Sequence, residues 1–154
     1  MNVHYPVPLR TLVLLSALMI SGLVQAENCS IDLKAGDAIK FDRQSITVDA
    51  TCKKITINLT HTGKLPAATM GHNVVIAPTD AFQSVAQDGM VAGLAGDYVK
   101  AGDSRVIAHT KIIGGGETAT ASFTGNKLKA GGAYTFFCSA PGHWSLMHGQ
   151  LVVK

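Results

Sequence analysis

The chain has 154 residues, with 13 Lys or Arg and 10 Asp or Glu, so its formal net charge at pH 7 is only +3. Arg10 is the only basic residue before position 27, which leaves 12 basic and 10 acidic residues, a net charge of +2, on the rest. A charge this small and evenly spread gives no reason to expect nucleic-acid binding or binding to a membrane surface.

The first 26 residues have the pattern of a secretory signal peptide. Arg10 precedes a nearly uninterrupted apolar run at 11–24, and Val24-Gln25-Ala26 has the small-residue pattern of a cleavage site. A membrane anchor is the alternative, but this run is shorter than the roughly 20 residues that cross a bilayer. We therefore expect a signal peptide at 1–26, cleavage after Ala26, and one domain at 27–154 that is free of the membrane.

Alternation of apolar and polar residues predicts strands over most of the segment 29–76. The clearest run is 53–61, where Ile55, Ile57 and Leu59 alternate with polar residues. The same pattern predicts strands on both sides of a turn at 34–37, then at 45–50 and 74–76. The first half of the domain is therefore mainly β.

Residues 79–94 are different, because their apolar side chains recur at helical spacing. Thr79 or Asp80 can cap this helix, and Gly93 and Gly96 end it. Beyond it we expect strands at 104–113, 117–123, 133–138 and 149–154. Short strands at such regular spacing are typical of an antiparallel sandwich or a Greek-key barrel, here with one inserted helical segment.

The three cysteines are an odd number for an exported protein. Cys29 and Cys52 lie near the mature N terminus on either side of predicted strands, and an oxidising compartment would let them form a disulfide. Closing a loop of this length contributes about 3 kcal/mol in the chain-entropy picture. Cys138 is then left as an inert buried thiol, a nucleophile or a metal ligand.

The neighbours of Cys138 favour the metal ligand. Within ten positions, Cys138, His143 and Met147 offer a thiolate, an imidazole and a thioether, and Pro141-Gly142 makes a turn between the first two. This mixture suits copper that cycles between two oxidation states, whereas zinc rarely accepts Met. The loop has one His before Met147, so a second must come from elsewhere. His72 is the best candidate, and the pattern predicts a blue-copper electron carrier.

Gly71-His72-Asn73, the segment 103–111 and the loop from Cys138 to Met147 resemble the azurins, small periplasmic blue-copper proteins of bacteria in the cupredoxin family. The spacing is specific, with four residues between Cys138 and His143 and three between His143 and Met147. The resemblance covers nearly all of 27–154, including Cys29 and Cys52, where azurins carry a disulfide. It implies an all-β Greek-key sandwich of about eight strands.

The resemblance also implies roles for single residues. One copper ion would be held in a plane by His72, Cys138 and His143, with Met147 and the carbonyl oxygen of Gly71 as weak axial ligands. Asn73 would brace the loop by bonding to the region of Ser139, outside the ligand set. Electrons would pass through an exposed apolar patch made of Leu65, Met70, Met90, Ala140, Pro141, Gly142, Trp144 and Leu146.

Three positions depart from the azurin pattern. Val74 stands where azurins often have a buried Trp, and Ala140 and Trp144 stand where many have a larger aromatic and a small residue. His61 resembles a semi-buried azurin histidine whose protonation tunes the reduction potential, although a core histidine with satisfied hydrogen bonds fits nearly as well. His148 is expected at the surface.

Other functions fit the pattern less well. An enzyme would use Cys138 as nucleophile and His143 as base, but Met147 has no role in that arrangement. Copper oxidases and nitrite reductases need further copper sites with His-x-His motifs, which this sequence lacks. Copper storage or delivery is the remaining alternative. As a carrier, the protein is expected to be a periplasmic monomer that transiently meets c-type cytochromes or a periplasmic reductase.

Overall fold

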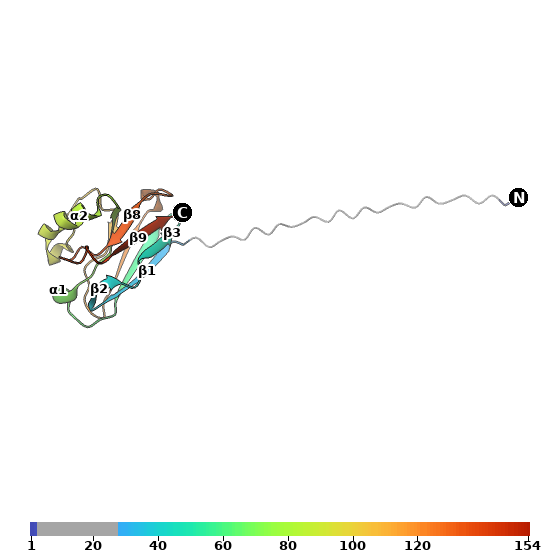
Figure 1. Cartoon of the computed structure of the whole chain (residues 1–154). Coiled ribbons are helices and arrows are strands. Elements are labelled where there is room, and N and C mark those ends of the chain that lie inside the picture. The colour runs from blue at the N-terminus through green and yellow to red at the C-terminus, as the bar shows by residue number, and fades with distance from the viewer. Residues whose placement is uncertain (3–27) are drawn as a thin grey trace.

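The structure of the protein is a computed structural model that describes residues 1–2 and 28–154. The predicted signal peptide and its cleavage site fall almost entirely outside the described residues. In the part that is described, two sheets form the body of the molecule, and α1 (Ala67–Met70) and α2 (Phe82–Gly89) lie at the end opposite the C terminus (Figure 1). None of the described helices is long and apolar enough to cross a membrane.

The first sheet contains four strands in the order β2-β1-β4-β7. Along β4, inward side chains are buried and outward ones half-buried, as the alternation at 53–61 predicted. The inward residues Ile55, Ile57 and Leu59 are almost fully buried in the main core. The strands are β1 (Ser30–Gly36), β2 (Ala38–Phe41), β4 (Ile55–His61) and β7 (Thr118–Phe123).

The second sheet has five strands in the order β3-β9-β8-β5-β6. Neighbouring residues of β8 face opposite sides, so Phe136 packs into the main core, while Phe137 packs in a second cluster with Val85 and Ala86 of α2. α2 therefore covers the outer face of this sheet. The strands are β3 (Ser45–Val48), β5 (Val75–Pro78), β6 (Ala108–His109), β8 (Tyr134–Phe137) and β9 (His148–Val153).

Two strand pairs differ from the predicted antiparallel arrangement. β1 pairs with β4 in parallel, and β3 pairs with β9 in parallel, whereas the other pairs are antiparallel. Side chains alternate with the same period in both kinds of pair, so the sequence pattern carries no sign of strand direction.

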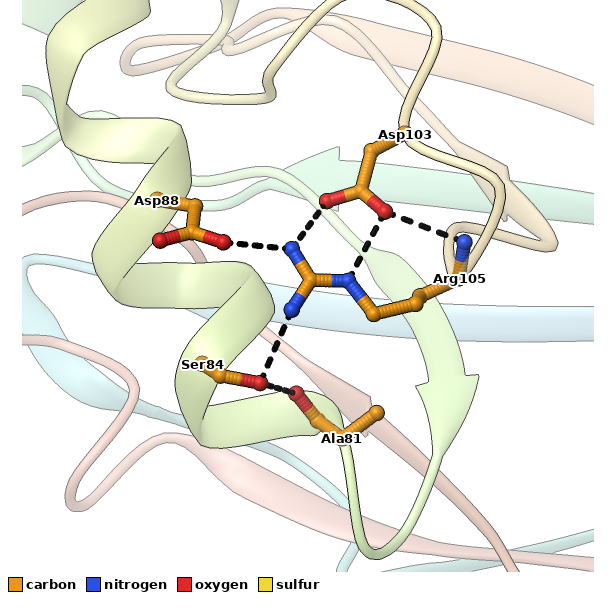
Figure 2. Close-up of polar contacts among 5 residues, drawn as sticks. All are labelled: Ala81, Ser84, Asp88, Asp103 and Arg105. Atoms are coloured by element: carbon orange, nitrogen blue, oxygen red, sulfur yellow. Dashed lines mark hydrogen bonds and ion pairs between the residues drawn. The ribbon is translucent and has the colours of Figure 1, made fainter.

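The predicted helix at 79–94 forms as α2, followed by the 3-10 turns η1 (Met90–Ala92) and η2 (Leu94–Gly96). We call residues 82–96 the flap. Its helix is tied to the next loop by Arg105, which donates to Ser84 and Asp88 on α2 and to Asp103 (Figure 2). The short helices α1 and η3 (Gly125–Lys127) were not predicted.

The predicted strand at 104–113 is largely wrong, because only Ala108 and His109 form β6. The rest of the segment is not a continuous strand, although Ile113 forms an isolated antiparallel bridge with His72. The Ile107 N–H donates to the Ile76 carbonyl, whereas the Ile112 N–H donates to the Asp97 carboxylate. Side-chain acceptors thus replace part of the ladder that a regular strand needs.

The disulfide between Cys29 and Cys52 is confirmed, with Cα atoms 5.6 Å apart. These residues precede β1 and β4, which run in parallel away from them. At the other end, Phe137 pairs with both Val75 and His148. The segments 71–74 and 138–147 therefore meet at one end of the second sheet, far from the disulfide.

Candidate metal centre

The predicted ligands of the sequence meet at this end of the sandwich. The Cys138 sulfur lies 3.8 Å from Nδ1 of His72 and 3.5 Å from Nδ1 of His143. All three residues are buried, and their candidate ligand atoms lie within 4.8 Å of one another. His72 and Cys138 come from segments that are 66 residues apart in the chain.

These separations fit a shared metal ion. Bonds of about 2.3 Å to sulfur and 2.0 Å to nitrogen, at angles between tetrahedral and trigonal, place the two ligand atoms about 3.5–3.7 Å apart. One thiolate with two imidazoles and a weak thioether is the ligand set of blue-copper sites. The spacing alone would also suit zinc, whereas a thiolate with two imidazoles is consistent with copper.

Burial sets the protonation of the three residues. Burial raises the pKa of the Cys138 thiol to about 11, and hydrogen bonds from the backbone N–H groups of Asn73 and Ala140 oppose that rise. Burial lowers the pKa of His72 to about 4 and lowers the pKa of His143. Both imidazoles are thus neutral at pH 7, as metal binding requires, and only the thiol has a proton to lose.

A backbone carbonyl fixes the orientation of His72. Nε2 of the ring lies 2.7 Å from the carbonyl oxygen of Gly36 at the end of β1. Because a carbonyl only accepts hydrogen bonds, Nε2 carries the proton and Nδ1 keeps its lone pair toward Cys138. A carbonyl of the first sheet thereby orients His72, a candidate ligand that lies at the end of the second sheet.

The loop that carries His143 is shaped by a tight turn. The His143 N–H donates to the Ala140 carbonyl, and Gly142 has φ +79° after Pro141, which is the pattern of a type II turn. Met147 follows and is 1% exposed, with its N–H bonded to the His143 carbonyl and its carbonyl bonded to the Cys138 N–H. The loop is thus closed by its own backbone.

The Gly71 carbonyl oxygen lies 4.0 Å from the Cys138 sulfur. A Cβ at Gly71 would come within 2.3 Å of the Ala67 carbonyl oxygen and 2.7 Å of an Ile112 methyl carbon. Only glycine fits here, so the close packing of α1 and Ile112 fixes this carbonyl beside the sulfur.

Asn73 and Ser139 form a buried pair, which we call the brace. The Ser139 N–H donates to Oδ1 of Asn73 at 2.9 Å, and Nδ2 of Asn73 donates to the Ser139 hydroxyl at 2.8 Å. The two residues adjoin His72 and Cys138 in sequence. The brace therefore links the two segments that carry the candidate ligands.

Comparison with known proteins agrees with this geometry. Residues 27–154 match the family model described as copper binding proteins, plastocyanin/azurin family. The chain belongs to this family. It is 58% identical over 123 residues to the azurin of Alcaligenes faecalis, an alignment that covers 80% of this chain and 96% of that protein.

Two further relatives extend the match. The azurin of Pseudomonas aeruginosa is 48% identical over 147 residues, covering 95% of this chain and 99% of that protein. The solved azurin Az-iso2 of Methylomonas sp. strain J has 42% identity and a TM-score of 0.79, covering 82% of this chain and 98% of that one. The two sheets with their inserted helix are therefore the cupredoxin fold of the plastocyanin/azurin family, and the group of His72, Cys138 and His143 is consistent with one copper ion.

The predicted patch residues differ in exposure. Leu65, Met90, Pro141, Gly142 and Leu146 are exposed, and Leu146 is the most exposed of the large ones at 71%. Met70 and Trp144 are half-buried. Ala140 is only 5% exposed, but it lines a depression of about 160 Å³ together with Gly71, Pro141 and His143.

The sequence prediction missed Val91, Leu94 and Asp97. Val91 and Leu94 add exposed apolar surface on η1 and η2, and Asp97 bonds to the brace. Among the other histidines, His61 stacks on His72 with ring centroids 5.0 Å apart. Its Nδ1 accepts the Gly63 N–H and its Nε2 lies 2.9 Å from the Met70 carbonyl, so neither nitrogen is free for a metal.

Proposed function

We propose that the protein is a one-electron carrier that uses a single type 1 copper ion held by His72, Cys138 and His143. The observation that carries this proposal is one buried thiol with the Nδ1 atoms of two neutral imidazoles 3.5 and 3.8 Å away. A copper ion bound there supplies cycling between Cu(II) and Cu(I), and this ligand set suits both states.

The protein excludes water from the site and fixes the orientation of its ligands. Cys138 and His72 are fully buried, which excludes water from the sulfur. The Gly36 carbonyl holds the His72 ring, and the brace holds the backbone that follows Cys138. Because these contacts come from groups other than the metal, they hold the ligands in place, and few atoms need to move when charge arrives. The Met147 thioether and the Gly71 carbonyl would be further, weaker ligands of the ion.

Electrons enter and leave through the exposed apolar patch beside His143. His143 is 8% exposed and borders the depression lined by Ala140 and Pro141, so its ring is the ligand nearest to solvent. Exposed apolar side chains rimmed by polar residues favour brief contacts with other proteins. The patch comprises Leu65, Met70, Met90, Ala140, Pro141, Gly142, Trp144 and Leu146, extended by Val91 and Leu94.

Export places the carrier in the periplasm. The signal-like segment 1–26 and the disulfide between Cys29 and Cys52 both favour an oxidising compartment. Its partners would be c-type cytochromes or a periplasmic reductase, met one at a time by a monomer. No catalytic activity is proposed, because Cys138 and His143 serve the metal.

Titration of the purified metal-free protein with Cu(II) tests this function. We expect an intense blue band that saturates at one copper per chain, disappears on reduction and returns on reoxidation. Cys138→Ser should fold and give no such band. If the protein instead binds Cu(I) tightly and remains colourless after oxidation, it stores or delivers copper and the carrier proposal is wrong.

A further inference from the structure

We propose that Asp97 is a positioning residue for the copper site, which anchors the brace to the flap. This inference rests on the carrier function proposed above. Asp97 follows η2, and its side chain does not belong to the candidate ligand group. Asp97 acts indirectly: it holds the brace, and the brace positions Cys138.

The Asp97 carbonyl oxygen is the shared acceptor of both brace side chains. Nδ2 of Asn73 donates to it at 2.8 Å, and the Ser139 hydroxyl donates to it at 3.2 Å. The brace thus becomes a closed triangle of Asn73, Ser139 and Asp97. A displaced Asp97 carbonyl would leave the hydroxyl proton of Ser139 without this acceptor, in a place where Ser139 is 1% exposed.

The backbone at this point is held in an unfavourable conformation. Asp97 and Tyr98 have φ angles of 57° and 51°, and they are the only non-glycine residues with positive φ in the described chain. Asp tolerates this left-handed region better than most residues, whereas a bulky aromatic residue does not. Two such residues in a row persist only where the surrounding contacts fix them.

Those contacts come from two sides. The Asp97 carboxylate accepts the Ile112 N–H at 2.7 Å, and the Tyr98 N–H donates to the Gly93 carbonyl at 2.9 Å. On the flap, Gly89 packs so tightly on this turn that a Cβ there would lie 2.2 Å from the Tyr98 carbonyl oxygen. The turn therefore stands between the flap, with its exposed apolar residues, and the brace beside Cys138.

Three variants test this role. Asp97→Asn keeps a side-chain oxygen acceptor and tolerates left-handed φ, whereas Asp97→Ala removes the acceptor and keeps the strain. Arg105→Gln is the control, because it loosens the flap at α2 without a contact to the brace. Amide hydrogen exchange in the metal-free protein is measured at Ile112 and Ser139. Visible absorption and reduction potential are measured with copper bound.

In Asp97→Ala, exchange at both Ile112 and Ser139 should accelerate about tenfold or more, because a partly buried donor loses its acceptor and the brace loosens. The absorption maximum and the potential should shift as well. Asp97→Asn should stay within about twofold of wild type, and Arg105→Gln should accelerate exchange only in residues 82–89. If Asp97→Ala does not fold, Asp97→Gly replaces it, because glycine accepts this φ without strain.

The proposal is overturned if the Ala or Gly variant accelerates exchange at Ile112 but leaves Ser139, the absorption and the potential at wild-type values. Asp97 would then support only the loop that carries Ile112. The exchange measurements need no metal. Their result therefore stands even if wild-type protein gives no blue band, and the two proposals can fail separately.

Discussion

The two ends of the sandwich are held together by different kinds of interaction. At the end near Cys29 and Cys52, the contacts are mainly a disulfide and hydrogen bonds to backbone carbonyls, one of them from the Asn28 side chain. There the Ala50 N–H donates to the Lys154 carbonyl, and the Lys154 N–H donates to the Val48 carbonyl. This end is closed by covalent and main-chain contacts.

At the opposite end, where segments 71–74 and 138–147 meet, buried polar side chains make the contacts. We call this the copper end. These residues are His61, His72, Asn73, Ser139 and His143. Within the described part of the chain, no buried side-chain nitrogen or oxygen lacks a hydrogen-bond partner. A network of this kind is costly when one member is lost, because the remaining members stay buried without partners.

Stability and copper chemistry therefore depend on separate ends of the molecule. A disulfide acts mainly on the unfolded chain and needs no fine adjustment in the folded one. Ligands, in contrast, must be oriented to a fraction of an ångström by the contacts around them. Changes at the disulfide end should therefore alter stability alone, and changes at the copper end should alter the metal site first.

Removal of the disulfide is the largest test of this separation. The double variant Cys29→Ala, Cys52→Ala should lose about 3 kcal/mol of unfolding free energy, because the loop of the unfolded chain is no longer closed. Urea unfolding of the metal-free protein measures this loss. The blue band of the copper-loaded variant should keep its position, and a shifted band would show that the two ends are coupled.

Asn73→Leu should have the next largest effect on the free energy of unfolding. Unlike the loss of the disulfide, it should also change the properties of the copper site. The buried Ser139 N–H loses its acceptor, and the Ser139 hydroxyl oxygen loses the donor Nδ2 of Asn73, at a cost of about 2 kcal/mol. The reduction potential should shift, because the backbone after Cys138 is no longer held.

A matched control uses another asparagine with side-chain hydrogen bonds. Asn58 of β4 bonds to Ser30 and Asp32 on the outer face of the first sheet. Asn58→Leu should cost less than about 1 kcal/mol, since its partners keep water as an alternative. The reduction potential of Asn58→Leu should match that of wild type. If the potential of Asn73→Leu is also unshifted, the brace does not tune the copper site.

The sequence predicted features that have a side-chain signature. The alternation in β4 predicted its buried face, and the chemistry of Cys138, His143 and Met147 by itself indicated a copper loop. The disulfide was predicted because two cysteines flanked strands near the same terminus. Each of these depends on residue type and spacing alone.

What could not be predicted depends on backbone atoms. The Gly36 carbonyl orients His72, and the Asp97 carbonyl receives the brace, yet every residue has a carbonyl. The predicted strand at 104–113 failed for a related reason, because the side-chain carboxylate of the distant Asp97 accepts the Ile112 N–H. Such contacts appear only when distant segments are folded together, and a local pattern cannot show them.

The ion pairs of Arg105 give a smaller and pH-dependent effect. The hydrogen-bonded guanidinium of Arg105 lowers the pKa of Asp103, so this carboxylate is charged more readily in the folded protein than in the unfolded one. Its stabilising contribution is therefore complete above the ordinary Asp pKa and is lost as the pH falls through the lowered value.

Arg105→Gln should thus be less stable than wild type at pH 7, and the difference should shrink as the pH is lowered below about 4. Thermal unfolding of the metal-free proteins at a series of pH values measures this. Because the flap, rather than the brace, loses its anchor, the copper band should not move. A stability difference that is the same at every pH would mean that packing of the long side chain, and not its charge, matters.

The smallest effect on stability, and the most selective one on function, is expected at the surface of the copper end. Leu146 is 71% exposed, so Leu146→Asp should change neither the unfolding free energy nor the blue band appreciably. It should slow electron exchange with a c-type cytochrome, because a carboxylate in the apolar patch must be desolvated when the two proteins meet. Leu65→Asp should act in the same direction.

Ala130→Asp is the matched control for charge. Ala130 is exposed, and the adjoining Gly131 bonds to Val153 at the end of β9 that is remote from His148. It therefore adds the same negative charge away from the patch. Stopped-flow exchange rates at two ionic strengths separate a general charge effect, which both variants share and salt screens, from a local one. Equal slowing in both variants would mean that net charge governs exchange, and that the apolar end is not where partners bind.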